Sequence, residues 1–371
     1  MGIVKTSYSK DDAIVLLKDL SAEMKPLSVH ERENLIQSGV HYSEMLPEEK
    51  RPSAEYSALY NKALKEKAED IAKCTAKLGE MMMARCTSGK PVIVSLARAG
   101  IPAGVLIKRY IKQKYNINCN HYSISIIRDK GIDVNAMEFI YSEEIEKGGN
   151  AVENILFVDG WTGKGVIKEQ LRESVMHLHN KSSKWDGLSD DLFVIADPAN
   201  VTPYCGTRVD YLLPIACLNS TVSGLISRTI LNNYIGEDDF HGAVYFKQFE
   251  DIDKSNEFVD TVSEYFEHIG DIEDDPMLID IGWSGMDIVD NICKQFNIAD
   301  YKKVKPGIGE TTRVLLRRLP WKVLINSNIS NEDSDIAHIL VLCKEKNIPI
   351  ERYDIGHYKV CGIIKELSAD A

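Results

Sequence analysis

One loop of the sequence gathers the side chains best suited to phosphate chemistry. It follows an apolar run at 155–158: Asp159 comes first, and Thr162 and Lys164 stand among glycines. Glycine lets backbone N–H groups approach a phosphate closely, and a helix starting after the loop adds partial positive charge. The pattern predicts a sugar-phosphate site, with an ordinary strand-to-helix turn as the alternative. The loop residues expected to contact a substrate are Gly160, Trp161, Thr162, Gly163, Lys164 and Gly165.

Two more turns place cations directly after apolar, β-branched runs. Arg98 follows the run 92–97, and a guanidinium in such a tight turn can hold an anion through paired hydrogen bonds. Arg128 and Lys130 follow the run 121–127, where basic side chains can close over a reaction centre. An arginine on a solvated turn is the alternative in both places. The first turn's other expected contacts are Ser95, Ala99 and Gly100.

The polar stretch 197–232 supplies a further candidate wall for this site. Asp197 follows the apolar run 192–196, and Asn219 and Arg228 lie among small polar residues. These side chains suit the acceptor side of a transfer reaction, whereas a capped loop before a helix is the alternative.

Alternating strands and helices must position these turns. Strands are expected at 90–97, 121–127, 154–160, 192–198 and 208–214, with helices between them. Such βαβ spacing predicts an α/β fold with a parallel sheet, and ligands of parallel sheets bind beyond the carboxyl ends of the strands. The first 84 residues are expected to form a helical extension that ends in a long amphipathic helix after Pro52.

Composition narrows the class of protein. The 371 residues carry a net charge of −12, so general binding of polyanions by the whole surface is disfavoured. We expect no membrane helix and no signal peptide, because no apolar run is long enough and the N-terminus lacks a cleavage site. Eight cysteines without CxxC spacing indicate reduced thiols in a cytoplasmic protein.

The charge changes sign near 280–290, a candidate domain boundary. Residues 301–322 hold seven basic side chains and one acid, whereas 237–290 hold seventeen acids and two lysines. After Gly307 the pattern predicts a basic helix, a strand at 321–325, a helix at 336–347 and a strand at 348–355. This is a compact α/β/α unit, and we divide the chain at 84/85 and 285/286.

The turns that follow the apolar runs 92–97, 121–127 and 155–158 together resemble type I phosphoribosyltransferases. The resemblance extends over roughly residues 85–235. The resemblance implies transfer from phosphoribosyl pyrophosphate to a nucleobase-like acceptor with Mg²⁺. It implies that Thr162 and its glycines hold the 5-phosphate and that the catalytic residues are Asp159, Arg98, Arg128 and Lys130. No protein metal ligands are expected. The family's second consecutive acid is replaced here by Gly160, which favours a non-catalytic nucleotide sensor as the alternative.

Residues 286–371 resemble a Pelota/L7Ae-like RNA-binding domain. Gly307, Glu310 and Arg313 match that family's Gly, Glu and Lys, while Gly309 replaces its Asn. The resemblance implies binding of structured RNA; a helix that docks on the acidic stretch 237–290 is the alternative. The expected RNA contacts are Lys305, Gly307, Glu310, Arg313, Arg317 and Arg318.

The order of the two units resembles the phosphoribosyltransferase–Pelota proteins of tellurium-resistance and stress gene clusters. Some of these carry the label StiP cysteine protease, which makes a cysteine peptidase the second alternative. Cys205 and Cys217 lie in the polar stretch, and no Cys–His pair is evident in the sequence. We also expect self-association into homo-oligomers.

Overall fold

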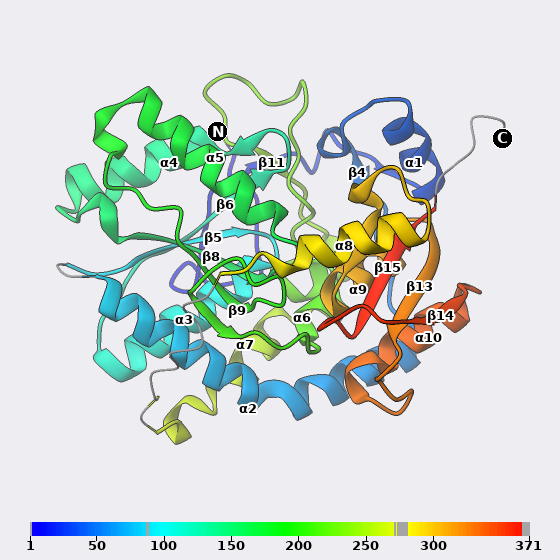
Figure 1. Cartoon of the computed structure of the whole chain (residues 1–371). Helices are drawn as coiled ribbons and strands as arrows, with labels where there is room; N and C mark the ends of the chain where they lie inside the picture. The colour runs from blue at the N-terminus through cyan, green and yellow to red at the C-terminus, as the bar shows by residue number, and fades with distance from the viewer. Residues whose placement is uncertain (1, 87–88, 271, 273–280, 366–371) are drawn as a thin grey trace.

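A parallel sheet forms the centre of the larger unit in the computed structural model, which describes residues 2–86, 89–270, 272 and 281–365. The sheet has the order β1-β6-β5-β8-β9-β10, all neighbours on this path are parallel, and β7 pairs antiparallel with β6 (Figure 1). The α/β prediction is therefore confirmed. The strands are β1 (Ile14–Val15), β5 (Val92–Ala97), β6 (His121–Ile127), β7 (Gly131–Ile132), β8 (Ile155–Trp161), β9 (Leu192–Ala196) and β10 (Cys205–Thr207).

Helices cover both faces of this sheet, as its uninterrupted apolar strands require. Alternate side chains of β8 show the two faces: Leu156 and Val158 join one buried cluster and Phe157 joins the other. One face packs against α2 (Ala54–Arg85) and α3 (Gly100–Tyr115), and α7 (Ser255–Ser263) packs on these two helices. The opposite face packs against α4 (Val134–Ile140), the π-helical turn Tyr141–Lys147 and α5 (Val166–Lys181).

The N-terminal segment is less helical than expected. Its long amphipathic helix is confirmed as α2, but the described residues before it form short strands, the helix α1 (Val29–Gln37) and a 3-10 turn at Tyr42–Glu44. The β1 strand pairs with β6 and so belongs to the main sheet rather than to a separate extension. The other short strands are β2 (Lys18–Asp19), β3 (Pro26–Leu27) and β4 (Leu46–Pro47), with β11 (Gly242–Ala243) pairing to β2.

The strand expected at 208–214 is also displaced. The fifth parallel strand is β10 at Cys205–Thr207, and the later residues lead into the short helix α6 (Pro214–Cys217). Pro214 at the start of α6 suits the first turn of a helix, where no backbone N–H is needed.

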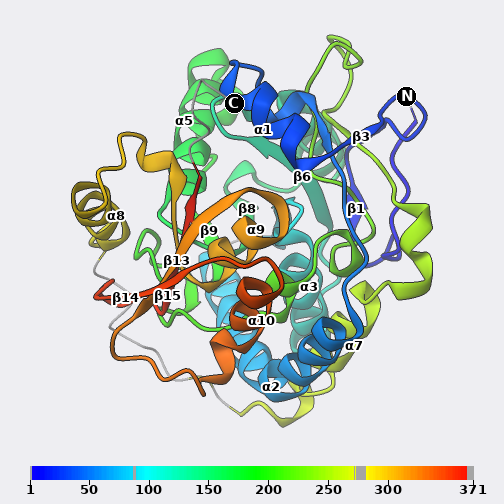
Figure 2. The same cartoon turned by 90° about the vertical axis from the view of Figure 1, so that its right-hand side faces the viewer.

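The C-terminal unit is a four-stranded sheet with three helices. Its strand order β12-β15-β13-β14 and the helix after Gly307 match the expected α/β/α arrangement. The unit packs on the larger one, with α9 against α6. Its α10 lies against α2 (Figure 2). Its elements are α8 (Ser284–Gln295), β12 (Val304–Pro306), α9 (Ile308–Arg317), β13 (Pro320–Asn326), α10 (Ala337–Glu345), β14 (Ile350–Tyr353) and β15 (Val360–Ile364). Residue 280, the first residue of the expected boundary region 280–290, lies outside the residues that the structure describes.

Candidate functional site: the junction of the two units

The loop after β8 is engaged within the protein itself. The Thr162 hydroxyl donates to the Asp197 carboxylate at 2.5 Å, and both side chains are buried. Asp197 also accepts from the backbone N–H groups of Val201 and Thr202 and from Arg208. These hydrogen bonds engage two side chains that were expected to contact a substrate, Thr162 at the sugar phosphate and Asp197 on the acceptor side.

Lys164 from the same loop holds the C-terminal unit. Its ammonium donates to the carbonyl oxygens of Tyr301 at 2.5 Å and Val304 at 2.9 Å, and burial lowers the Lys164 pKa to about 7. The Gly163 carbonyl accepts from the Tyr358 hydroxyl at 2.7 Å. The loop that follows β8 is therefore a docking surface for the C-terminal unit.

Two glycines allow this close approach. A Cβ on Gly309 of α9 would lie 2.4 Å from the Trp161 ring, and a Cβ on Gly163 would lie 2.5 Å from Cγ of Glu310. The Arg313 guanidinium also stacks over Trp161, 4.2 Å from the ring centroid. The residues expected to bind sugar phosphate and those expected to bind RNA thus face each other.

Arg98 is bound by a carboxylate from a distant part of the chain. It donates to Glu49 Oε1 at 2.7 Å, to the Ile226 carbonyl at 2.9 Å and to Asn219 Oδ1 at 3.3 Å. Glu49 also accepts from the backbone N–H and the hydroxyl of Ser220. Nothing in the sequence around Glu49 points to this partnership.

The other residues of this turn serve the fold. The Ser95 hydroxyl bonds His121 Nε2 at 2.8 Å, and both residues are fully buried. Ala99 precedes α3 and makes no side-chain cap. Gly100 lets α3 approach β8, since a Cβ there would lie 2.5 Å from the Val158 carbonyl oxygen.

Arg128 and Arg228 meet at one tyrosine. Their guanidinium carbons lie 5.4 and 4.4 Å from the ring centroid of Tyr42, a residue that the sequence did not single out. Arg128 also pairs with Asp129 at 3.4 Å, whereas Lys130 is exposed. The aromatic ring holds the two cations by cation–π attraction.

The arginines in α9 and directly after it point toward the larger unit. Arg317 donates to Asn219, and Arg318 donates through two nitrogens to Glu33 on α1. Arg313 pairs with Glu310 at 3.0 Å. The acidic stretch 237–290 supplies none of these partners, so the expected docking of α9 on that stretch does not occur among the described residues.

The start of α9 is fixed by another residue that sequence reasoning missed. Asp210 accepts from the backbone N–H of Ile308 at 2.9 Å and from that of Lys359 at 2.9 Å. Gly307, with φ at 90°, turns the chain into this helix in a conformation that favours glycine. Burial raises the Asp210 pKa to about 6, although both backbone hydrogen bonds oppose that shift.

Together these side chains form what we call the cationic cluster. It contains eight basic residues in a protein of net charge −12, and each lies beside others of the same sign. Four carboxylates pair with it, from Glu33, Glu49, Asp129 and Glu310. The members of the cluster are Arg32, Arg98, Arg128, Arg228, Lys305, Arg313, Arg317 and Arg318.

Asp159 lies at the edge of the cationic cluster. Burial raises the Asp159 pKa to about 6, although the Arg313 charge opposes the shift, and its Oδ1 accepts from the Gly160 backbone N–H at 2.7 Å. Within the described ranges, no group of three or more metal-ligating side chains occurs. Mg²⁺ binding stays a prediction.

All eight cysteines are free thiols. Burial raises the pKa of the Cys217 thiol to about 12, although a hydrogen bond with Tyr56 opposes the shift. Tyr56 donates its hydroxyl to the Cys217 carbonyl at 2.8 Å, and its ring lies 6.5 Å from that of His338 on α10. His338 in turn bonds the Thr312 hydroxyl at 2.7 Å. Among the described histidines, no ring nitrogen is hydrogen-bonded to a thiol.

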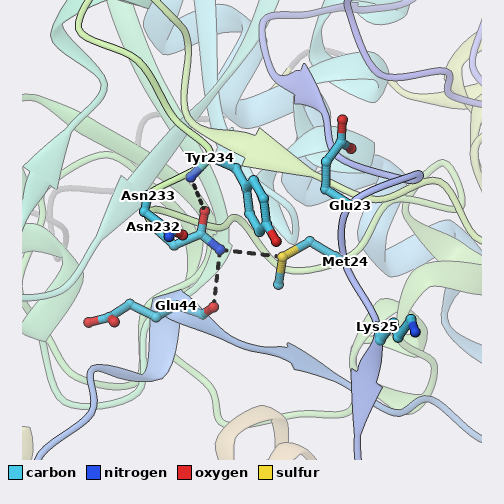
Figure 3. Close-up of a pocket in the computed structure, with 7 residues that line it drawn as sticks. All are labelled: Glu23, Met24, Lys25, Glu44, Asn232, Asn233 and Tyr234. Atoms are coloured by element: carbon cyan, nitrogen blue, oxygen red, sulfur yellow. Dashed lines mark hydrogen bonds between the residues drawn. The ribbon is translucent and has the colours of Figure 1, made fainter.

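A hollow of about 690 Å³ is lined by residues that do not belong to the cationic cluster (Figure 3). Its wall includes Asn232, whose amide nitrogen donates to the Glu44 carbonyl at 3.2 Å and lies 3.3 Å from the Met24 sulfur. The lining holds neither cysteine nor histidine, so we assign it no role in thiol chemistry. Its residues are Glu23, Met24, Lys25, Glu44, Asn232, Asn233 and Tyr234.

Comparison with known proteins gives two matches along the chain. Residues 6–263 match the family described as tellurite-like stress resistance cysteine protease StiP, and residues 283–366 match the Pelota RNA binding domain. The protein named "Cysteine protease StiP" of Acinetobacter baylyi is 30% identical over 378 residues, which cover 97% of this chain and 94% of the relative.

These similarities correct the functional prediction. Transfer from phosphoribosyl pyrophosphate to a nucleobase-like acceptor was wrong, as was the assignment to the pentosyltransferases, because the matching family and the relative are cysteine proteases. The Pelota-like domain is confirmed. Among the described residues, no helix is long and apolar enough to cross a membrane. Cytoplasmic location and self-association stay predictions.

Proposed function

We propose that this chain, which belongs to the StiP family of cysteine proteases, is itself a cysteine peptidase whose C-terminal unit binds RNA. The near-full-length similarity to a relative named as a cysteine protease carries this proposal. The family match ends at residue 263, so we look for the nucleophile before that point. Five thiols precede it: Cys74, Cys86, Cys119, Cys205 and Cys217.

Cys217 is our candidate nucleophile. It ends α6, which packs against α9 of the C-terminal unit, and Tyr56 stands between it and the His338 imidazole. A thiol nucleophile needs a base and a group that orients it, and these neighbours supply both types. The thiolate would attack the peptide carbonyl carbon and imidazolium would protonate the leaving amine. Water would then cleave the thioester and restore the thiol.

The described arrangement is a resting state for this chemistry. Cys217 is 1% exposed, and burial lowers the His338 pKa to about 3, so the thiol keeps its proton and the imidazole is a poor base. A shift of α9 away from α6, with α10 still packed on α2, would let water reach both groups and return each pKa toward its ordinary value, and it would keep the His338 imidazole near Tyr56. The peptidase proposal therefore includes movement of α9.

Hydrolysis of a fluorescent casein by the full chain tests the function, with an epoxide inhibitor of cysteine peptidases as the probe. We expect hydrolysis that the inhibitor abolishes and a mass shift on the peptide containing Cys217. Cys217→Ala should lose activity, whereas Cys343→Ala, at another buried thiol beyond residue 263, should retain it. Activity that survives Cys217→Ala would move the nucleophile elsewhere, and hydrolysis insensitive to the inhibitor would end the peptidase proposal.

RNA binding is supported by the Pelota match and by the basic character of residues 301–322. In the described structure Arg313, Arg317 and Arg318 are occupied by partners within the chain. RNA contacts through these side chains would therefore replace contacts at the junction. Fluorescence anisotropy of the full chain with a kinked RNA duplex should show affinity that falls steeply with salt, because phosphate contacts release counterions. Affinity independent of salt would argue against phosphate contacts.

A further inference from the structure

The cationic cluster has more positive charge than the protein itself balances. Arg98, Arg128, Arg313 and Arg318 each have a carboxylate partner. Arg32, Arg228, Lys305 and Arg317 form no ion pair with any residue in the described part of the chain. Buried or half-buried charges are costly unless they are paired, so these four cations, each beside other arginines of the cluster, are unfavourable without a ligand.

Arg32 shows most directly that hydrogen-bond donors remain unused. The residue is 1% exposed, and its Nε and Nη2 atoms have no hydrogen-bond partner. Its Nη1 makes only a long bond of 3.4 Å to the Arg317 carbonyl. Unsatisfied buried donors of this kind are rare in proteins, since each forfeits the hydrogen bonds it made with water.

Arg228 is held in place without its donors being used. Its guanidinium stacks on Tyr42 at 4.4 Å and makes no hydrogen bond to another described residue. Burial lowers the Arg228 pKa to about 9, and the charges of Arg32, Arg98 and Arg318 add to this shift. Stacking fixes the plane of the guanidinium and leaves its N–H edge available for a planar, bidentate contact with an oxyanion.

We propose that Arg32, Arg228 and Arg317 bind a compact polyphosphate anion at the junction of the two units. Arg32 comes from α1, Arg228 from the polar stretch 197–232 and Arg317 from α9, so the ligand would join the C-terminal unit to the larger one. Several negative charges in a small volume match four unpaired cations better than a single carboxylate does. The extended backbone of RNA, with one charge per nucleotide, suits these deep donors less well. The proposal concerns binding, and no bond is made or broken.

Calorimetric titration of the full chain with inorganic tripolyphosphate tests this site, with thermal unfolding measured in parallel. We expect one anion per chain and a higher melting temperature when it is bound. Arg228→Gln should weaken binding about tenfold or more, because a charge-assisted contact is lost. Without the anion, Arg228→Gln should melt at or above the parent, since it removes an unpaired cation from repelling neighbours. The matched control is Arg172→Gln on α5, whose side chain is 56% exposed and which should change neither property.

Several results would overturn the proposal. The proposal is wrong if the parent does not bind tripolyphosphate. It is also wrong if Arg228→Gln has a lower melting temperature than the parent without the anion and binds tripolyphosphate with the parent's affinity. If Arg172→Gln weakened tripolyphosphate binding as much as Arg228→Gln does, the anion would be held only by general attraction to the protein surface. A 5′-hydroxyl oligouridine that binds as tightly and depends equally on Arg228 would identify a nucleic-acid site instead. Arg32→Met provides a second variant if Arg228→Gln does not fold. These measurements need no peptidase activity, so their failure would leave the proposed function standing.

Discussion

The pairing of Glu49 with Arg98 offers a sharp test of how the junction is held. Both side chains are 5% exposed, and Glu49 also accepts two hydrogen bonds from Ser220. Removing one partner of a buried ion pair leaves the other charge unpaired, which typically costs about 3–5 kcal/mol. Arg98 would then face the Arg317 charge without its nearest counter-charge. We therefore expect Glu49→Gln to lower the free energy of unfolding by about 3–5 kcal/mol.

Urea unfolding followed by tryptophan fluorescence measures this loss. Glu48→Gln is the matched control, because its side chain is exposed and the change should stay within about 0.5 kcal/mol. The double variant Glu49→Gln/Arg98→Met should be less unstable than the sum of the single variants, since removing both charges leaves none unpaired. A loss below about 1 kcal/mol for Glu49→Gln, or strict additivity, would refute the argument.

The pH dependence supplies an independent check. Burial alone would raise the Glu49 pKa, but Arg98, Arg317 and Ser220 outweigh it and hold the pKa below its usual value. A carboxyl with a depressed folded-state pKa stabilises the protein at neutral pH, and this contribution is lost as pH falls through the folded-state pKa. The difference between the parent and Glu49→Gln should therefore shrink in acid.

Three further outcomes are expected. Burial raises the Asp159 pKa to about 6, so ionisation of Asp159 opposes folding as the pH rises through that range. Asp159→Asn should therefore raise the free energy of unfolding at pH 8 by up to about 3 kcal/mol. At pH 4 the same change should leave the free energy of unfolding nearly unchanged. Gly309→Ala should lower the free energy of unfolding by about 1–3 kcal/mol, because the added Cβ would meet the Trp161 ring. Gly270→Ala, at a position with open space around it, should leave the free energy of unfolding nearly unchanged. Equal losses for the two variants would show that the contact between Gly309 and Trp161 is not tight. Saturating RNA should speed alkylation of Cys217, measured by mass spectrometry, if RNA draws α9 away from α6; an unchanged rate would separate RNA binding from exposure of the thiol.

The elements of both units could largely be predicted because apolar runs and helical periodicity are local properties. The runs at 92–97, 121–127 and 192–196 became β5, β6 and β9, and Gly307 does begin a helix. The two-residue strands before Pro52 carry no such pattern, since their pairing depends on distant partners. Ser28 and Glu31 form a capping box at the start of α1, but such a local motif does not reveal which unit the helix contacts.

The site was predicted less well because residue type does not reveal a partner. Lys164 suits a phosphate, yet it donates to two carbonyls of the C-terminal unit. Arg98 suits an anionic ligand, and its anion is Glu49, 49 positions earlier in the chain. The phosphoribosyltransferase activity was wrongly assigned for the same reason: loops that follow a parallel sheet can hold a ligand or another domain, and the sequence of the loop alone does not decide between them.

The same physical property links the proposed peptidase, RNA and anion sites, namely the charge at the junction. A polyphosphate bound by Arg32, Arg228 and Arg317 would neutralise repulsion between the units and keep α9 against α6, with Cys217 covered. RNA that draws on Arg317 would instead remove a cation from the junction and favour separation. The two ligands should therefore shift the protein in opposite directions, because a ligand stabilises only the arrangement that it binds better. Tripolyphosphate should slow alkylation of Cys217 under conditions where RNA speeds it. If both ligands changed the rate in the same direction, Cys217 would not be controlled through the junction.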